Sequence, residues 1–238
     1  MALFSRLPVS SVADNRTALQ LIRERIARAA ADAQRPADSV NLIAVSKTQP
    51  TSAILSLVEQ GQRDFAENYL QEALPKIAEL RQHALCWHFI GQLQSNKTRP
   101  VAESFDWVHT VDREKIAERL SAQRPFHAPA LQVCVQVKLA HEATKGGAIA
   151  SELPTLLTAI DKLPRLQLRG LMAIPPASHD IAVQRHWFRE LYGIFQSLHA
   201  DFPTLDVLSM GMSADLEAAI LEGSTHIRIG TALFGARQ

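Results

Sequence analysis

The 238-residue chain has only two cysteines, Cys86 and Cys134. They form no CxxC motif and share no metal-type spacing with the histidines, which argues against a disulfide framework and against a zinc module. Each lies in an apolar run typical of a strand, where a buried free thiol is the usual outcome. We therefore predict no metal site, and a reducing cytoplasm as the compartment.

The sequence also has no large net charge and no long apolar segment. The formal net charge is +1, which excludes a general electrostatic attraction to nucleic acid or to an anionic membrane. No apolar run approaches membrane-spanning length, and the N-terminal residues lack the sustained apolar stretch of a signal peptide. We expect neither nucleic-acid nor membrane partners.

No GxGxxG motif follows the first expected strand, which argues against an open dinucleotide-binding sheet. No linker rich in serine, glycine or proline divides the chain either. A closed (β/α)₈ barrel typically takes about 250 residues, nearly the length available here. We predict one domain over residues 1–238, with an extra N-terminal helix at roughly 12–34 and an α/β TIM-type barrel from roughly 40 to 238.

Short apolar segments alternate with helical ones along the chain, as a parallel barrel requires. Eight strands are expected, at Leu42–Ser46, Asp64–Ala66, Cys86–Ile90, Trp107–Thr110, Leu131–Lys138, Leu166–Met172, Asp206–Ser209 and Ile227–Ile229. Helices are expected between them, including Ser52–Gln60, Tyr69–Arg81, Arg113–Ser121, Ser151–Lys162, Ala182–His199 and Ala214–Glu222.

Lys47 directly follows the first strand and would lie at the carboxyl-end mouth of the barrel. A surface lysine that starts a loop is the ordinary interpretation. A partly desolvated lysine with a lowered pKa, able to attack an aldehyde, is the functional one. Lys47 alone does not decide between them.

The C-terminal segment favours the functional interpretation. Ser213 stands where the N-cap of a helix is expected, and Gly223 suits the stop of that helix. Gly230 and Thr231 follow the last strand. In barrels of this type phosphate commonly binds at the loops after strands seven and eight, and strand one is the next neighbour of strand eight. Lys47 should therefore face a phosphate site.

Six segments together resemble the signatures of the pyridoxal phosphate homeostasis proteins, whose cofactor is pyridoxal 5′-phosphate (PLP). They are Ile43–Thr48, Phe65–Glu72, Trp87–Lys97, Gly170–Pro175, Ser209–Asp215 and Arg228–Gly235. The resemblance covers nearly the whole chain, from about Ala18 to Arg237. It implies the fold-type III barrel of alanine racemase without the second domain of that enzyme.

The resemblance assigns the cofactor-binding residues. Lys47 carries PLP as a Schiff base, Arg228 faces the pyridine nitrogen, and the remaining five contact the phosphate (Ser213, Gly230, Thr231) or line the site (Asn68, Ser209). Because a guanidinium keeps its proton, the ring nitrogen should stay unprotonated, which weakens the ring as an electron sink. No catalytic residue is assigned.

A few positions depart from the family pattern. Lys138 and Ala140 stand where the family tends to have an asparagine and a serine, and Ala66 replaces a commoner glycine. Lys145 and Gly147 match. The polar run from Gln92 to Lys97 belongs to the signature, but its chemical role does not follow from the residues.

Three functions are weighed. The first is intracellular PLP homeostasis, in which the cofactor is held, exchanged or delivered to apoenzymes with little or no turnover. The second is a weak amino-acid racemase, which needs proton donors on both faces of the ring, whereas only Lys47 is evident and the two tyrosines, Tyr69 and Tyr192, lie in unsuitable segments. A Schiff-base aldolase without PLP leaves Arg228 and the phosphate loops unused. A monomer is expected, with a dimer as the alternative.

Overall fold

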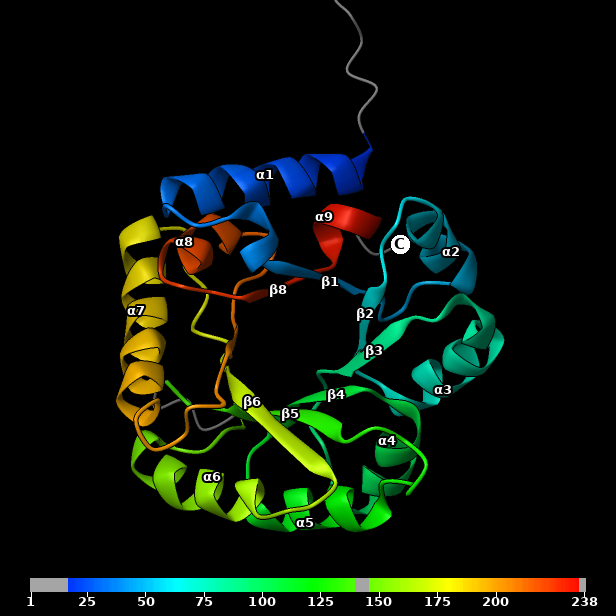
Figure 1. Ribbon diagram of the computed structural model, residues 1–238. Coiled ribbons are helices and arrows are strands. Elements are labelled where there is room, and N and C mark those ends of the chain that lie inside the picture. The colour runs from blue at the N-terminus through cyan, green and yellow to red at the C-terminus, as the bar shows by residue number, and fades with distance from the viewer. Residues whose placement is uncertain (1–16, 140–145, 236–238) are drawn as a thin grey trace, which may run out of the picture.

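The computed structural model describes residues 17–139 and 146–235. Eight parallel strands close into a barrel in chain order, which confirms the predicted fold (Figure 1). The strands are β1 (Asn41–Val45), β2 (Asp64–Glu67), β3 (Cys86–Phe89), β4 (Trp107–Val111), β5 (Leu131–Gln136), β6 (Leu166–Met172), β7 (Val207–Ser209) and β8 (His226–Ile229).

Helices surround the ring of strands on its outer side (Figure 1). They are α1 (Ala18–Asp32), α2 (Thr51–Glu59), α3 (Leu70–Glu79), α4 (Thr98–Ser104), α5 (Glu114–Gln123), α6 (Leu153–Asp161), α7 (Ile181–Leu198), α8 (Leu216–Leu221) and α9 (Thr231–Phe234). Over the two described ranges, no helix combines the length and the apolar character needed to cross a bilayer.

The helix α1 lies across the outside of the barrel, next to α8 and α9 (Figure 1). Thr17 starts it with a capping box: its hydroxyl accepts from the Gln20 amide, and the Gln20 side chain accepts from the Thr17 amide. Arg25 donates two hydrogen bonds to Glu217 of α8. The predicted extra helix is thus present, and its expected first residues, 12–16, lie outside the described part of the chain.

The strand β1 closes the barrel by pairing with β2 on one side and with β8 on the other. In the second pair Ile43 lies opposite Arg228 and Ala44 opposite Ile229. The carboxyl ends of the first and last strands therefore meet at one edge. This register brings Lys47 beside the loop that follows β8.

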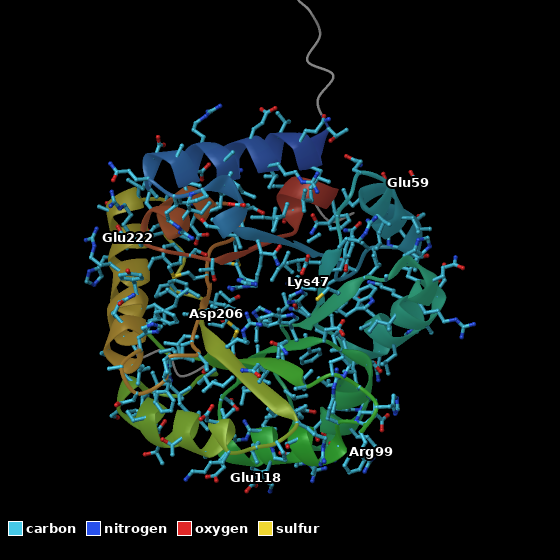
Figure 2. All side chains as sticks on the ribbon, viewed as in Figure 1. Lys47, Glu59, Arg99, Glu118, Asp206 and Glu222 are labelled. Atoms are coloured by element: carbon cyan, nitrogen blue, oxygen red, sulfur yellow. The ribbon has the colours of Figure 1, made fainter. Side chains whose placement is uncertain are left out.

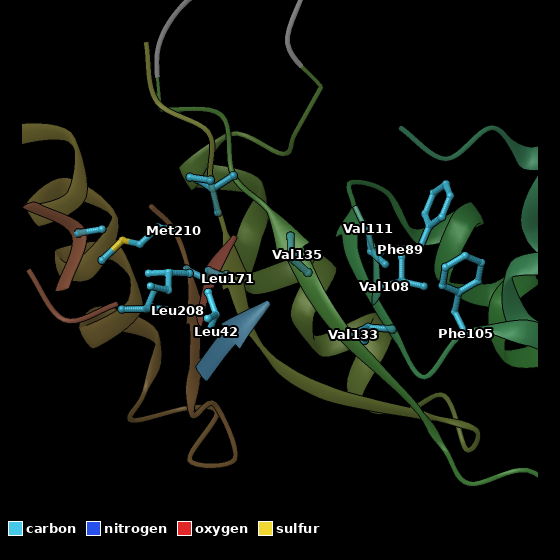
Figure 3. Packing of buried hydrophobic residues seen from close by; sticks show 14 of the residues in the cluster. Leu42, Phe89, Phe105, Val108, Val111, Val133, Val135, Leu171, Leu208 and Met210 are labelled. Atoms are coloured by element: carbon cyan, nitrogen blue, oxygen red, sulfur yellow. The ribbon is translucent and has the colours of Figure 1, made fainter. Parts of the chain in front are cut away.

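The two faces of the strands bury different kinds of side chain. Outward-facing residues pack with the helices into a large apolar core, part of which is shown in Figure 3, including Leu42, Phe89, Val108 and Phe105. The two other apolar clusters of the described core are small, one around Trp107 and Cys134 and one around Ile43 and Val45. The second face also carries the polar residues of the site.

The structure differs from the expected elements in three places. The helices α4 and α9 were not predicted; both are short, and Pro100 interrupts the helical pattern in α4. Ser213 is not the N-cap of α8, because the helix begins at Leu216 and Asp215 occupies the capping position. The Asp215 carboxylate accepts from the Met212 amide at 2.6 Å, which holds the preceding residues in a turn. Gly223, with φ of +95°, ends the segment as predicted.

Candidate functional site

A pocket of about 310 Å³ opens at the carboxyl ends of the strands. It is lined by Val45, Lys47, Asn68, Ile90, Met172, Ile174, Met212, Ser213, Ala214, Arg228, Gly230 and Thr231. Six of the seven residues predicted for the cofactor site are among them. The seventh, Ser209, is fully buried and accepts a hydrogen bond from Arg228, which lines the pocket.

Lys47 lies toward the middle of the ring of strands (Figure 2). It also lines a hollow of about 50 Å³ together with Gly230 and Thr231. The next residue, Thr48, has a φ of +64°, which is uncommon for a β-branched side chain and marks local strain. Its amide donates to Glu72 of α3 at 2.9 Å, so the chain turns sharply just after the lysine.

A buried ion pair fixes the end of β1 from the outer side. The Lys76 ammonium of α3 donates to the Ser46 carbonyl at 2.9 Å and to Glu67 Oε1 at 2.8 Å. The Ser46 hydroxyl donates to the same carboxylate oxygen at 2.7 Å. Burial raises the pKa of Glu67, and the hydrogen bonds from Lys76 and Ser46 oppose that shift. Strand, helix and the residue before Lys47 are therefore held together.

The loops after β7 and β8 meet at the pocket. Ser213 Oγ accepts from the Ala232 amide of α9 at 3.4 Å, which joins the two loops. Gly211 has a φ of +95°, and a Cβ there would lie 2.6 Å from the Ala219 side chain. Only glycine fits this turn without displacing α8. Backbone and hydroxyl groups of both loops are thereby gathered near Lys47.

Arg228 reaches the pocket from inside the barrel and is 3% exposed. Its guanidinium donates to Ser209 Oγ at 2.7 Å and to the Ala173 carbonyl at 3.1 Å. Burial lowers the pKa of Arg228 to about 10, and the negative charge of Asp215 opposes the shift. The side chain remains a cation at neutral pH, with the donor-only character that the sequence analysis assumed.

Asn68 provides a test of whether the pocket fits a polar ligand. Its side-chain oxygen Oδ1 is buried and has no hydrogen-bond partner within the described structure. A buried acceptor without a donor costs about 1–3 kcal/mol. A ligand that brings a hydroxyl or another donor to this pocket would satisfy Asn68, and PLP carries a ring hydroxyl. The residues present therefore fit the predicted group.

Comparison with known proteins decides the family. The model of the alanine racemase N-terminal domain matches residues 18–238. A pyridoxal phosphate homeostasis protein of Pseudomonas aeruginosa is 53% identical over 229 residues, covering 96% of this chain and 97% of that one. The protein of the same name from Escherichia coli is 49% identical over 222 residues, covering 92% and 95%. The chain belongs to the pyridoxal phosphate homeostasis protein family.

Solved structures agree with this family. PipY of Synechococcus elongatus, solved with PLP bound, is 41% identical to this chain, with a TM-score of 0.78 and coverage of 90% of this chain and 100% of that one. An alanine racemase of Clostridium difficile is 14% identical, with a TM-score of 0.66 and coverage of 92% of this chain and 56% of the racemase chain. That distant likeness shows the shared barrel fold.

Two buried histidines, His88 and His109, lie inside the barrel next to the site, and the sequence assigned neither of them to it. His88 is fully buried and has hydrogen-bond partners. His109 contacts both His88 and Ser209. The available signal was the alternation of side chains along a strand, because residues two apart, such as Cys86 and His88, point to the same face.

The polar run that the sequence left unexplained lines a second hollow of about 330 Å³ beside the pocket. Gln92, Gln94 and Lys97 contribute to it, and Asn68 borders both spaces. Ala66, which replaces a commoner glycine of the family, is buried with Ile43 and Val45. Ala140 and Lys145 lie outside the described residues.

Proposed function

We propose that this chain is a single-domain PLP carrier of the cytoplasm that holds the cofactor covalently on Lys47. It would exchange PLP or deliver it to apoenzymes, with little or no turnover. The observation that carries the proposal is the convergence of Lys47, Arg228 and the Ser213 and Gly230–Thr231 loops on one pocket. When bound, PLP supplies an aldehyde that condenses with amines and a pyridine ring that withdraws electrons.

Each residue has a proposed task in holding the cofactor. Ser213, Gly230 and Thr231 would bind the phosphate through hydroxyl and backbone donors, a charge-assisted arrangement. Asn68 would accept from the ring hydroxyl. Arg228 would donate to the pyridine nitrogen and leave that nitrogen unprotonated. The names of the curated relatives, and the PLP-bound structure of PipY, support PLP as the ligand.

Low turnover is proposed because the pocket offers few groups that move protons. Among its described lining residues, Lys47 and Arg228 are the ionisable ones. Tyr69 is 54% exposed and borders the neighbouring hollow, whereas Tyr192 lies on α7 against Gly223. A two-base racemisation needs a second acid or base across the ring from Lys47. Neither tyrosine lines the pocket to supply it.

The covalent assignment is tested by borohydride reduction of PLP-loaded protein followed by intact mass. Lys47→Ala should abolish the reduced adduct, because no other described amine lines the pocket. Lys97→Ala is the matched control, since it removes a lysine from the neighbouring hollow at the same end of the barrel and should leave the adduct intact. A reduced adduct of unchanged yield in Lys47→Ala would refute the assignment.

The turnover assignment needs a separate measurement. PLP-loaded protein is incubated in deuterated water with L-alanine, and α-deuterated or D-alanine is followed over time. We expect no sustained accumulation of either product. Continuous accumulation over many protein equivalents would overturn the proposal in favour of a racemase.

A further inference from the structure

Five residues from five strands form an unbroken line of hydrogen bonds through the barrel, which we call the interior chain. His88 Nε2 lies 3.0 Å from Asp64 Oδ1, His88 Nδ1 lies 2.9 Å from His109 Nε2, and His109 Nδ1 lies 2.8 Å from Ser209 Oγ. Arg228 donates to Ser209 Oγ at 2.7 Å. The line begins at Asp64, at the amino-terminal end of the strands, which we call the amino-end pole, and leads to the pocket.

The two ends of the interior chain determine the direction of its first and last bonds. A guanidinium can only donate, so Ser209 Oγ accepts from Arg228. An ionised carboxylate can only accept, so His88 Nε2 must carry the hydrogen that points to Asp64. Burial alone would raise the pKa of Asp64, but hydrogen bonds from His88 and Asn41 lower it below its ordinary value. Asp64 is therefore the acceptor at neutral pH.

His109, which lies between these ends, is neutral and has one N–H. Burial lowers the pKa of His109 well below its ordinary value, and the neighbouring His88 and His226 add to the shift. With a single hydrogen, on Nε2, His88 accepts at Nδ1 from His109. His109 then carries its own hydrogen on Nε2 and accepts at Nδ1 from the Ser209 hydroxyl. Every donor and acceptor in the line is used once.

A competing contact does not change this assignment. Cys86 Sγ lies 3.4 Å from His88 Nε2, but burial raises the pKa of Cys86 and keeps it a neutral thiol, which accepts weakly. The closer carboxylate of Asp64 therefore takes the hydrogen. Asp64, Cys86 and His88 also place their polar atoms within 4.8 Å of one another, a spacing that could admit a metal ion. Measurements on this pole are therefore made with EDTA present.

We propose that Asp64, His88 and His109 are positioning residues for Arg228. By fixing both imidazoles with the hydrogen on Nε2, they turn the Ser209 hydroxyl hydrogen away from Arg228, so that the serine oxygen is free to accept from the guanidinium. The Ala173 carbonyl holds the other end of the guanidinium. The importance of this for the cofactor rests on the proposed function, in which Arg228 meets the pyridine nitrogen.

The tautomers are tested first, on protein without PLP. Histidine labelled with ¹⁵N is observed by long-range proton–nitrogen correlation, and the signals are assigned by their loss in His88 and His109 variants. Both residues should carry the hydrogen on Nε2. Asp64→Ala, which truncates a side chain 25% exposed at the pole, should shift His88 and His109 to mixed tautomers. Hydrogen on Nδ1 of either residue in the wild type, or unchanged tautomers in Asp64→Ala, would overturn the proposal.

Two further variants separate hydrogen bonding from general effects. Asp206→Ala is the matched control, because it removes a carboxylate near the same pole that pairs with Arg169 outside the interior chain, and it should leave the tautomers unchanged. Asp64→Asn should restore them, because the Asn41 amide donates to Oδ1 and keeps an oxygen turned toward His88. Failure of Asp64→Asn to restore them would show that charge, and not acceptance of the hydrogen bond, is what matters.

The second measurement uses PLP-loaded protein. Asp64→Ala should release PLP about two- to tenfold faster than the wild type, as expected for loss of one neutral hydrogen bond, and should shift the absorption band of the bound cofactor. Asp64→Asn should reverse both changes. If the tautomers change but the rate of PLP release and the absorption spectrum do not, the interior chain does not act on Arg228. Absence of any adduct in the wild type would instead refute the proposed function, while the tautomer result would stand.

Discussion

Two groups of buried polar side chains lie on opposite faces of the same barrel, and they neutralise charge in different ways. Outside the strands, Glu67 and Lys76 meet directly at 2.8 Å, an arrangement we call the outer ion pair. Inside, the carboxylate of Asp64 and the guanidinium of Arg228 are separated by two imidazoles and a hydroxyl. The two charges of the outer ion pair are in direct contact, whereas the two charged ends of the interior chain are separated by a line of hydrogen-bonding groups.

The difference lies in what remains after one group is removed. Loss of a partner from the outer ion pair leaves a full charge in a low-dielectric environment, which is the most unfavourable outcome for a buried group. Loss of a middle member of the interior chain leaves neutral donors and acceptors unsatisfied, at lower cost. The outer ion pair should therefore contribute more to stability, and the interior chain more to orientation.

The largest effect is expected for Glu67→Gln. The substitution keeps the side-chain volume but leaves the Lys76 ammonium buried without a counter-charge, so the free energy of unfolding should fall by about 3–5 kcal/mol. Urea denaturation measures it. The double variant Glu67→Leu with Lys76→Met removes both charges and should recover most of the loss. A decrease below about 1 kcal/mol in Glu67→Gln would mean that the outer ion pair is not effectively buried.

A smaller effect is expected for His109→Leu. The leucine has a similar volume, but His88 Nδ1 loses its donor and the Ser209 hydroxyl loses its acceptor. The free energy of unfolding should fall by about 1–3 kcal/mol, measured by urea denaturation under the same conditions. A decrease larger than that of Glu67→Gln would reverse the order of the two groups and contradict the comparison.

Acid should destabilise the protein because a buried imidazole in the barrel interior is harder to protonate in the folded chain than in the unfolded one. Burial lowers the pKa of His226 to about 4, with His88 adding to the shift. In the unfolded chain a histidine takes up its proton near pH 6.5, so this contribution to stability is complete above that pH and is lost as pH falls from about 6.5 to 4. Between about pH 7 and 5 we expect a loss of about 1–2 kcal/mol from this residue.

The pH dependence is measured as the free energy of unfolding at the two pH values in the wild type and in His226→Gln. The variant should lose less stability on acidification. The exposed residue His127 gives the control, and His127→Gln should keep the wild-type dependence. Burial raises the pKa of Glu67 and Asp215, which acts in the opposite direction, and subtracting the variant isolates His226. Equal pH dependence in all three proteins would contradict the assignment.

The sequence predicted the barrel and the mouth of the pocket because both follow from short-range signals, whereas Asn68, Ser209 and Arg228 were assigned by the family resemblance. Apolar segments of strand length separated by helices define the fold, and the position just after a strand defines the mouth, where Lys47, Gly230 and Thr231 lie. The sequence did not predict the interior chain, because its members come from five strands spread between Asp64 and Arg228. Only closure of the barrel brings them together, and no local spacing encodes their hydrogen bonds.

The smallest effect is expected for an ion pair at the surface of the amino-end pole. Arg169 makes two hydrogen bonds to Asp206, whose side chain is 55% exposed. Exposed pairs contribute about 0–1 kcal/mol, so Asp206→Ala should lower the free energy of unfolding by less than about 1 kcal/mol. Salt distinguishes the effect of Asp206→Ala from that of the outer ion pair. About 1 M sodium chloride shortens the screening length to about 3 Å and weakens interactions between exposed charges far more than between buried ones. Urea denaturation with and without salt should show the Asp206→Ala effect vanish while the Glu67→Gln effect persists, and equal salt sensitivity would place both pairs in the same environment.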